Sequence, residues 1–405
     1  MIKWITEQLG TAEKSKVDEK GYHIIDVRDL VDKKGNPERL ILGKINEGIK
    51  TIGGKGKVVI CCDYGISRSN AIAVGILVKH YGYNFNEAVK YITDKTGGEE
   101  MLLGFLNSVR TALRLDKVKK KNKKTILITG AQGFIGSTLT SLLKDKYELI
   151  TPLRSEIDLV KGQIDLDLIV KKLGVNLIVH LANPSIYTTT QSMGETIVML
   201  KNVLDICKEN EIPILYPSGL VVFAGYKRKI LTASENLPLY PKDTYGETKM
   251  LCENLLNQYR EFYGLNIALL RLSPVYGPSS DKPKFIWQFF EKAKKNLPIS
   301  VHKYKNGFQI IDLLNIKDAV SAISSVIEKN FNGTLHIGSG QGYTTFEIAK
   351  KIKEILNSKS EISFVEIDDY NANIVMDINK AKKTLGWSPK VSLDEGFGEI
   401  LKSIK

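Results

Sequence analysis

The sequence predicts two α/β domains in tandem, of which the second is the larger and is built on a doubly wound parallel sheet. Two observations support this fold class. Short β-branched segments alternate with helix-period segments in both halves, most regularly after residue 124. A run holding six lysines within residues 117–124 interrupts the alternation. We therefore expect domains at residues 1–115 and 124–405, joined by a lysine-rich linker at residues 116–123.

The composition is typical of a globular protein. Hydrophobic residues make up 43% and charged residues 25% of the 405 residues, which excludes a disordered or fibrous chain. Apolar runs stay far below the roughly 18 residues that a membrane span needs, and the first residues lack a secretory apolar core. The four cysteines are too few for a disulfide framework. These features predict a cytoplasmic protein without a membrane partner.

The net charge of +13 is the one compositional feature that suits a nucleic acid. Six of the lysines, however, lie within residues 117–124, and a short block of like charge is usually a solvated spacer. We therefore expect no nucleic-acid partner.

The first domain contains the pattern of an anion-binding loop. Strands are predicted over residues 23–29 and 57–61, and helices over residues 69–80 and from Asn84, where Glu87 completes a capping box. Between the second strand and the first helix, residues 61–69 read Cys-Cys-Asp-Tyr-Gly-Ile-Ser-Arg-Ser. Loop amides and a helix N-terminus that follow a strand favour a phosphate or a thiolate at one point.

Three side chains of this loop predict cysteine-dependent phosphomonoester hydrolysis. The same local field should lower the pKa of Cys62 below the ~8.5 of a free thiol, which makes it a nucleophile. Arg68 can grip two phosphate oxygens in a bidentate fork. Ser67 can donate to the thiolate or support the departure of a phosphocysteine intermediate.

These residues resemble the Cys-x-x-Gly-x-Ser-Arg-Ser signature of the dual-specificity and tyrosine phosphatase superfamily. The domain is short, and Cys61 stands where that family usually has a histidine. The resemblance implies a general acid, an aspartate on an upstream loop that protonates the leaving oxygen. Asp26 falls inside the predicted strand, whereas Asp32 opens a sequence resembling the acid loop of small microbial members. Asp32 is therefore preferred to Asp29, and the substrate is a phosphorylated small molecule or a phosphoprotein.

The second domain opens with the pattern of a dinucleotide-binding loop. After its first strand comes Gly130-Ala-Gln-Gly133-Phe-Ile-Gly136, followed by a helix. Gly130 permits a tight turn, Gly133 lets the backbone approach a pyrophosphate, and Gly136 lets helix and strand pack closely. The strands predicted for this domain span residues 125–129, 148–152, 177–181, 213–216 and 267–272.

A tyrosine and a lysine on one helix predict acid/base chemistry in the same domain. Tyr245 and Lys249 lie four apart after a capping box that starts at Thr244, so they share a helix face. A nearby ammonium stabilises phenolate and lowers the pKa of a tyrosine from ~10. Tyr91 and Lys95 have the same spacing, but they lie on an expected surface helix of the first domain.

Residues 124–405 resemble, over their whole length, the extended short-chain dehydrogenase/reductases of the NAD-dependent epimerase/dehydratase family. The resemblance implies a Rossmann-type sheet, a smaller C-terminal lobe from about residue 278, NADP or NAD as cofactor, and a nucleotide-linked sugar as substrate. The matching stretches include 129–136, 180–183, 245–249, 271–278, 312–318, 336–340 and 385–389. Beside Tyr245 and Lys249, the implied cofactor-binding residues are Gly130, Gln132, Gly133, Phe134, Ile135, Gly136, Arg154, Asp158, Leu181 and Ala182.

Two details of this second site stay open. The family places a serine or threonine four residues before a Val-Tyr tyrosine. If Phe223 takes that tyrosine's place, the hydroxyl position is Gly219, and its neighbour Ser218 is the alternative third catalytic group. At the end of the second strand, Arg154 favours the 2′-phosphate of NADP, whereas Asp158 would suit the ribose of NAD. The basic end of this strand resembles the family's deoxysugar reductases more than its epimerases.

The chain as a whole is therefore expected to be a bifunctional enzyme of sugar-nucleotide or surface-polysaccharide metabolism. Its chemistry would be phosphomonoester hydrolysis plus epimerase, dehydratase or reductase chemistry on a nucleotide-linked sugar. The alternative is a phosphatase regulated by a dinucleotide-sensing domain that has lost catalysis at Gly219. A homodimer is among the expected assemblies, and no metal site is expected.

Overall fold

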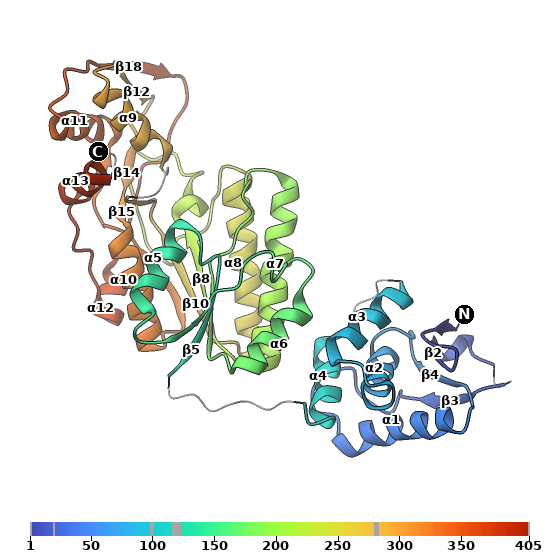
Figure 1. Ribbon diagram of the computed structural model, residues 1–405. Helices are drawn as coiled ribbons and strands as arrows, with labels where there is room; N and C mark the ends of the chain where they lie inside the picture. The colour runs from blue at the N-terminus through green and yellow to red at the C-terminus, as the bar shows by residue number, and fades with distance from the viewer. Residues whose placement is uncertain (1, 19–20, 98–100, 116–122, 279–282, 404–405) are drawn as a thin grey trace. The chain divides into compact units, whose positions relative to one another are not determined.

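A computed structural model describes residues 2–18, 21–97, 101–115, 123–278 and 283–403 (Figure 1). The chain forms two compact units. The first comprises residues 1–120 with residues 162–174, and the second comprises residues 121–161 with residues 175–405. The segment 162–174, which carries helix α6 (Gln163–Leu173), thus groups with the first unit. Apart from Lys123, the predicted linker at residues 116–123 lies outside the described residues.

The first unit contains a four-stranded sheet in the order β1-β2-β4-β3. Strands β2 and β3 both run parallel to the central strand β4, whereas β1 is antiparallel to β2. Every residue of β4 is buried, as expected of a strand covered on both faces. The strands span Lys3–Trp4 (β1), Leu9–Glu13 (β2), His23–Asp26 (β3) and Val58–Cys62 (β4).

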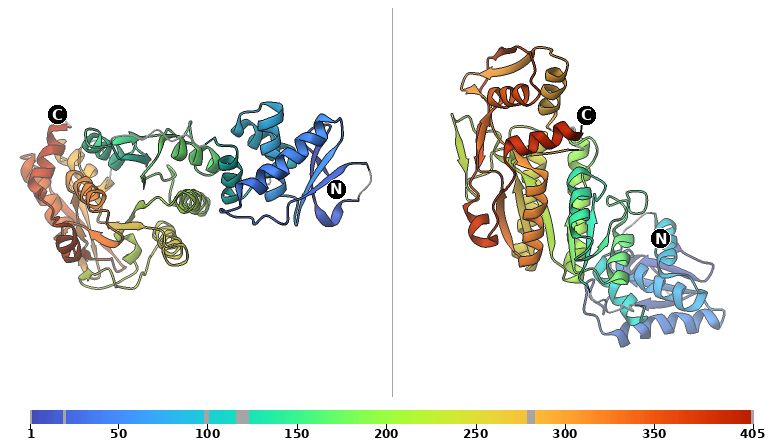
Figure 2. Two further views of the ribbon diagram at one scale, coloured as in Figure 1. Left: turned by 90° about the horizontal axis from the view of Figure 1, so that it is seen from below. Right: turned by 60° about the vertical axis from the view of Figure 1, so that its left-hand side comes forward.

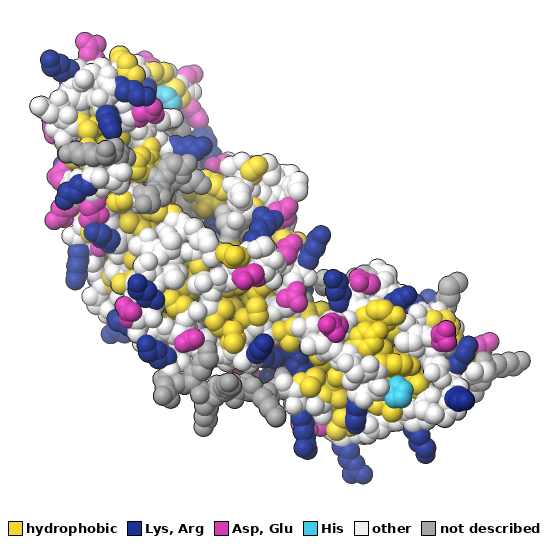
Figure 3. Space-filling view, in the orientation of Figure 1, with side chains coloured by type: hydrophobic (Ala, Val, Ile, Leu, Met, Phe, Trp, Pro, Cys, Tyr) yellow, Lys and Arg dark blue, Asp and Glu magenta, His cyan; other side chains and the backbone are white. Residues whose placement is uncertain are grey.

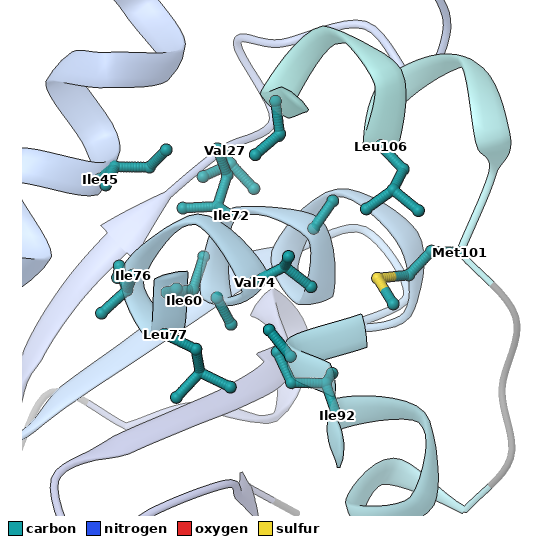
Figure 4. Packing of buried hydrophobic residues seen from close by; sticks show 14 of the residues in the cluster. Val27, Ile45, Ile60, Ile72, Val74, Ile76, Leu77, Ile92, Met101 and Leu106 are labelled. Carbon is teal, nitrogen blue, oxygen red and sulfur yellow. The ribbon is translucent and has the colours of Figure 1, made fainter. Parts of the chain in front are cut away.

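Helix α2 forms the centre of this unit and directly follows β4. Figure 4 shows its Ile72, Val74 and Ile76 surrounded by hydrophobic side chains of α1, α3, α4 and β4. Helix α3 begins with the predicted capping box at Asn84 and Glu87. The helices are α1 (Glu38–Gly53), α2 (Ser67–Tyr81), α3 (Phe85–Thr96) and α4 (Leu103–Ala112), with a 3-10 turn at Lys14–Lys16.

The second unit is built on six parallel strands in the order β16-β10-β8-β7-β5-β6. Because β5 lies between β6 and β7, the direction of winding reverses beside it, and ligands of such sheets bind at this switch point. The prediction of a doubly wound sheet is confirmed. The strands span Thr125–Thr129 (β5), Glu148–Ile150 (β6), Leu177–His180 (β7), Ile214–Gly219 (β8), Ile267–Leu272 (β10) and Gly333–Ile337 (β16).

Helices cover both faces of this sheet. Helices α7 and α8 pack together on one side, and α5 packs with α10 on the other, as Figures 1 and 2 show. These helices span Phe134–Leu143 (α5), Thr190–Asn210 (α7), Thr244–Tyr263 (α8) and Ile316–Lys329 (α10), and a 3-10 turn η2 spans Leu220–Phe223.

A smaller lobe has its own core and is formed mainly by residues after 283, although β9 joins it from earlier in the chain and β16 returns to the sheet. Tyr276, Phe290 and Phe397 pack edge to face in that core. Its helices are α9 (Lys284–Lys294), α11 (Thr345–Ile355) and α13 (Leu393–Ser403), whereas α12 (Asn379–Leu385) packs with α10 and β16 in the core of the sheet. Its strands pair as β13-β12-β18 (Gly307–Phe308, Ile299–Tyr304, Ile362–Ile367), β17-β14-β19-β9 (Gly342–Thr344, Ile310–Asp312, Ile374–Met376, Leu231–Ala233) and β11-β15 (Val275–Tyr276, Leu314–Asn315).

The described part of the chain contains no helix that is both long and apolar enough to cross a membrane. On the face drawn in Figure 3, Lys and Arg side chains are spread over both units with Asp and Glu side chains among them. This face therefore does not present the continuous basic stripe that is typical of nucleic-acid binding.

Candidate active sites

The first candidate site lies where β4 ends and α2 begins. Cys62 is the last residue of β4, and the loop that follows turns at Gly65, whose φ is +69°. A Cβ at Gly65 would lie 2.4 Å from backbone atoms of Ala12 and Glu13, so no other residue fits. Strand, tight loop and helix thus stand in the predicted order.

The thiol of Cys62 lies inside this loop. The Gly65 N–H donates to Sγ at 3.1 Å, and the hydroxyl of Ser69 is 3.4 Å from it. Burial alone would raise the pKa of Cys62, but hydrogen bonds from Ser69 and from loop amides outweigh it and bring the pKa below its ordinary value. The direction of this shift is the one that the sequence predicted for Cys62.

Cys61 lies on the opposite face of the sheet, because successive residues of a strand alternate. It packs with Ala12 and Val59 in a small hydrophobic cluster, and burial raises the pKa of its thiol to about 11. Of the two adjacent cysteines, only Cys62 therefore faces the loop, and only Cys62 has a lowered pKa.

Arg68 lies in the first turn of α2 with its guanidinium beside the loop. Its Nη1 donates to the carbonyl of Leu30 at 2.9 Å, and its Nη2 donates to Asp63. Its Nε is buried and has no protein partner. A buried donor without a partner is unfavourable, so this N–H is available to an anion in the loop.

Of the two roles predicted for Ser67, donation to the Cys62 thiolate is wrong, and support for the departure of a phosphocysteine stays a prediction. Ser67 Oγ donates instead to Oδ1 of Asp32 at 2.7 Å and accepts the N–H of Leu102 at 2.9 Å. Ser69 makes the contact with Cys62 instead. It is the third residue of α2, and side chains of a helix lean toward the helix N-terminus, where Cys62 lies.

The aspartates that compete as general acid lie in different surroundings. Ser67 holds Asp32 at the loop that contains Cys62. Asp29 forms an ion pair with Lys44 at 3.0 Å, and both carboxylate oxygens of Asp26 accept hydrogen bonds from Arg28. Of the three carboxylates, Asp32 has the contact to the loop that a general acid needs.

The second candidate site begins with the glycine loop between β5 and α5. Gly130 has a φ of +70°, and a Cβ there would lie 2.7 Å from the backbone of Ala182. A Cβ on Gly136 would lie 2.2 Å from the carbonyl oxygen of Gly130. Both positions therefore require glycine, as the sequence predicted. Gly133 is the N-cap residue of α5.

Two cavities adjoin at this loop, and each predicted cofactor-binding residue lines at least one of them. One cavity, of about 680 Å³, is lined by residues that include Phe134, Tyr245 and Lys249. The other, of about 350 Å³, is lined by residues that include Gln132, Arg154 and Asp158. The residues that line both are Gly130, Gly133, Leu181, Ala182 and Asn183. A ligand with two bulky ends joined at the glycine loop fits this arrangement.

Tyr245 and Lys249 lie on the first turns of α8. The helix is capped by Asp243, which accepts the N–H of Gly246 at 2.8 Å, so the predicted capping box at Thr244 is wrong. Lys249 is buried, and its Nζ is 5.8 Å from the centre of the Tyr245 ring. Lys249 thus places its positive charge beside the ring of Tyr245.

Tyr216 fixes the position of Lys249, a role that the sequence did not indicate. Lys249 Nζ donates to the hydroxyl of Tyr216 at 3.1 Å and to the carbonyl of Pro217 at 3.3 Å. Tyr216 is the third residue of β8 and is buried, like the two residues before it. In the sequence it resembles any aromatic core residue, because only the sheet register brings it beneath α8.

Gly219 has no hydroxyl to offer the substrate, although the space around it would accept a side chain. Gly219 ends β8 with a φ of −152°, which any residue adopts, and a Cβ there would meet nothing closer than 3.6 Å. Beside it, the hydroxyl of Ser218 is buried without a protein hydrogen-bond partner, and Ser218 lines the larger cavity. Phe223 is fully buried in a hydrophobic cluster.

Comparison with known proteins identifies this second unit. Residues 126–338 match the model of the NAD dependent epimerase/dehydratase family, which is half of the chain. The chain belongs to this family. It is 29% identical over 307 residues to the uncharacterised UDP-glucose epimerase YtcB of Bacillus subtilis, covering 67% of this chain and 95% of that protein. It is 29% identical over 322 residues to the dTDP-4-dehydro-6-deoxyglucose reductase of Escherichia coli, covering 70% and 98%.

Among solved structures, the UDP-glucose 4-epimerase of Thermotoga maritima with UDP-glucose has the same fold. The TM-score is 0.61 at 24% identity, and the match covers 69% of this chain and 98% of the epimerase. The cofactor of the family is a nicotinamide dinucleotide, in agreement with the expected NADP or NAD. The paired cavities and the glycine loop suit such a molecule, which would bring hydride-transfer chemistry to the site.

Arg154 and Asp158, which bear on the choice between NADP and NAD, both line the smaller cavity of this family member. Arg154 is exposed, and the carboxylate of Asp158 accepts the N–H of Val160 at 2.9 Å. The exposed Arg154 can bind the 2′-phosphate of NADP, whereas the carboxylate of Asp158, which a ribose of NAD would need, already binds the backbone. The preference for NADP stays a prediction.

Proposed function

We propose that the second unit catalyses epimerase, dehydratase or reductase chemistry on a nucleotide-linked sugar with NAD or NADP as cofactor. The observation that carries this proposal is the convergence of Tyr245, Lys249 and the glycine loop on one cavity of about 680 Å³. The relatives support the substrate class, since they are described as UDP-glucose and dTDP-4-dehydro-6-deoxyglucose enzymes.

The chain's own groups have distinct roles in this proposal. Tyr245 exchanges a proton with the reacting hydroxyl or carbonyl of the sugar, and Lys249 places its positive charge beside that phenol and contacts the nicotinamide ribose. Ser218 takes over the hydrogen bond that a residue at position 219 gives in the family. Its buried hydroxyl without a partner supports that role.

Replacement of Tyr245 tests this proposal. A thermal-shift panel of nucleotide sugars with each dinucleotide first identifies the ligands, because binding to the folded state raises stability. We expect Tyr245→Phe to lower turnover of the substrate so found by about 100-fold or more, the usual contribution of a general acid/base, while cofactor binding is retained. Gly133→Val should instead abolish cofactor binding by crowding the pyrophosphate.

Tyr91→Phe is the matched control, because Tyr91 also precedes a lysine by four residues but belongs to the first unit. It should leave turnover unchanged. Full turnover by Tyr245→Phe would contradict the assigned mechanism. Cofactor binding by the unmodified protein without turnover of any sugar would favour the alternative, a dinucleotide sensor that lost catalysis at Gly219.

We further propose that the first unit hydrolyses phosphomonoesters at Cys62. The Cys62 thiolate attacks phosphorus, so that an S–P bond forms and the P–O bond to the leaving group breaks. Asp32 in its acid form gives its proton to the leaving oxygen, and water then attacks the phosphocysteine to release phosphate and the thiolate. The lowered pKa of Cys62 and the free Nε of Arg68 support this assignment.

Adjacent cysteine variants test the phosphatase proposal. Cys62→Ser should abolish hydrolysis of a small aryl phosphate, because a serine hydroxyl is not ionised in this loop. Cys61→Ser should keep most of the activity, since Cys61 faces the other side of the sheet. Arg68→Lys should be severely impaired, because a point charge cannot replace the planar fork. Equal losses in both cysteine variants would contradict the assignment of Cys62.

A further inference from the structure

A carboxylate lies inside the anion-binding loop of the first unit, at the place where a phosphate would bind. Asp63 follows Cys62 directly, and its Oδ2 accepts a hydrogen bond from Nη2 of Arg68. The Asp63 side chain is 51% exposed, whereas that of Arg68 is only 12% exposed. Asp63 is thus free to turn away from a guanidinium that is held in place.

Asp63 and a phosphate need the same edge of Arg68. Nη1 already donates to the carbonyl of Leu30, so the edge left for a bidentate contact consists of Nε and Nη2. Nε is buried without a protein partner, and Nη2 is bound to Asp63. A phosphate that takes both donors therefore has to displace the carboxylate.

Arg28 offers the displaced carboxylate a second partner. Its guanidinium binds Asp26 through Nε and Nη2. The pKa of Arg28 is raised chiefly by this contact with Asp26, and the charge of Asp63 adds to the effect. Because Asp63 is itself a residue of the loop, it stays close after it leaves Arg68 and can compete for Arg68 again.

We propose that Asp63 is a positioning residue that sets the affinity of this loop for phosphate. By competing for Arg68, it weakens the binding of the phosphate product and speeds its release. The inference rests on the proposed phosphatase function, and it gives a reason for a negative charge in a loop that otherwise attracts anions.

Inhibition by inorganic phosphate tests the role of Asp63 in the full-length chain. We expect Asp63→Asn to lower the inhibition constant of phosphate by about fivefold, a modest factor because the ion pair is half exposed. KM for an aryl phosphate should fall with it, and kcat should fall rather than rise, since release becomes slower. If Asp63 had only a structural role, its replacement would not lower KM and kcat together in this way. Asp63→Ser should give the same result, which guards against a folding defect of one variant.

Asp26→Asn is the matched control, because Asp26 pairs with Arg28 and not with Arg68. It should change the inhibition constant by less than about twofold, the change expected from an exposed charge. In an Arg68→Lys background, calorimetric titration with inorganic phosphate should show little effect of Asp63→Asn, because the planar fork for which Asp63 competes is gone. An unchanged inhibition constant in Asp63→Asn, or an equal decrease in Asp26→Asn, would overturn the inference.

Direct binding separates this inference from the phosphatase function. If the unmodified protein hydrolyses no aryl phosphate, the phosphatase proposal fails, and calorimetric titration with inorganic phosphate still decides about Asp63. Tighter binding to Asp63→Asn than to the unmodified chain supports competition for Arg68. Equal binding to both overturns it.

Discussion

Asp32 and Asp29 lie three residues apart in the chain, yet only one of them is bound to the loop that contains Cys62. Asp32 accepts the hydroxyl of Ser67, whereas Asp29 is neutralised by Lys44 and its side chain is half exposed. We therefore expect Asp32→Asn to lower hydrolysis of alkyl phosphates by about 100-fold or more, because their leaving oxygen needs a proton. An activated aryl phosphate needs little protonation and should be affected far less.

Asp29→Asn provides the comparison for this measurement. It should reduce both substrates equally and only slightly, because its carboxylate is paired outside the loop. The rates of the two variants with a series of leaving groups distinguish the two aspartates. A strong dependence on the leaving group in Asp29→Asn, and none in Asp32→Asn, would show that the general acid is Asp29.

At the residue scale, the sequence indicates chemistry better than it indicates contacts. The positions of Cys62, Gly130 and Gly136 between a strand and a helix could be predicted, because each stands in a short run whose local pattern is distinctive. The side chains that contact Cys62 and Lys249 could not be predicted. Ser69 replaces Ser67 through the tilt of side chains in a helix, and Tyr216 meets Lys249 through the packing of β8 under α8.

At the scale of elements, local patterns predict what local forces determine. The five strands predicted for the second unit are all present, because buried parallel strands are short β-branched runs that stand out in the sequence. Ends are less certain: β6 stops at Ile150, two residues earlier than expected, and Asp243 rather than Thr244 caps α8. At such ends neighbouring polar residues compete for the same backbone groups.

The grouping of residues 162–174 with the first unit could not be predicted, because no local pattern reports which side chains a helix meets. The helical period of this segment is present in the sequence, and the structure forms α6 there. Its partners follow from tertiary packing alone. The sequence therefore predicts that a helix forms and which of its faces is buried, but not which other part of the chain packs against that face.

At the scale of the whole molecule, each candidate site lies within one unit. The residues around Cys62 belong to the first unit, and those that line the two dinucleotide cavities belong to the second. Each unit also has its own hydrophobic core. Coupling between two sites requires that a ligand of one changes the free energy of binding at the other. Separate sites and cores give no physical reason for a large coupling.

We therefore expect that saturating NAD or NADP leaves hydrolysis of an aryl phosphate by the full-length chain within about twofold, since coupling that matters in regulation usually exceeds fivefold. Phosphatase rates measured with and without each dinucleotide, after binding has been verified by thermal shift, provide the test. Gly133→Val serves as the control, because a dinucleotide that cannot bind should change nothing in that variant. A change of tenfold or more that Gly133→Val abolishes would contradict independence. Such a result would make the second unit a sensor that regulates the first.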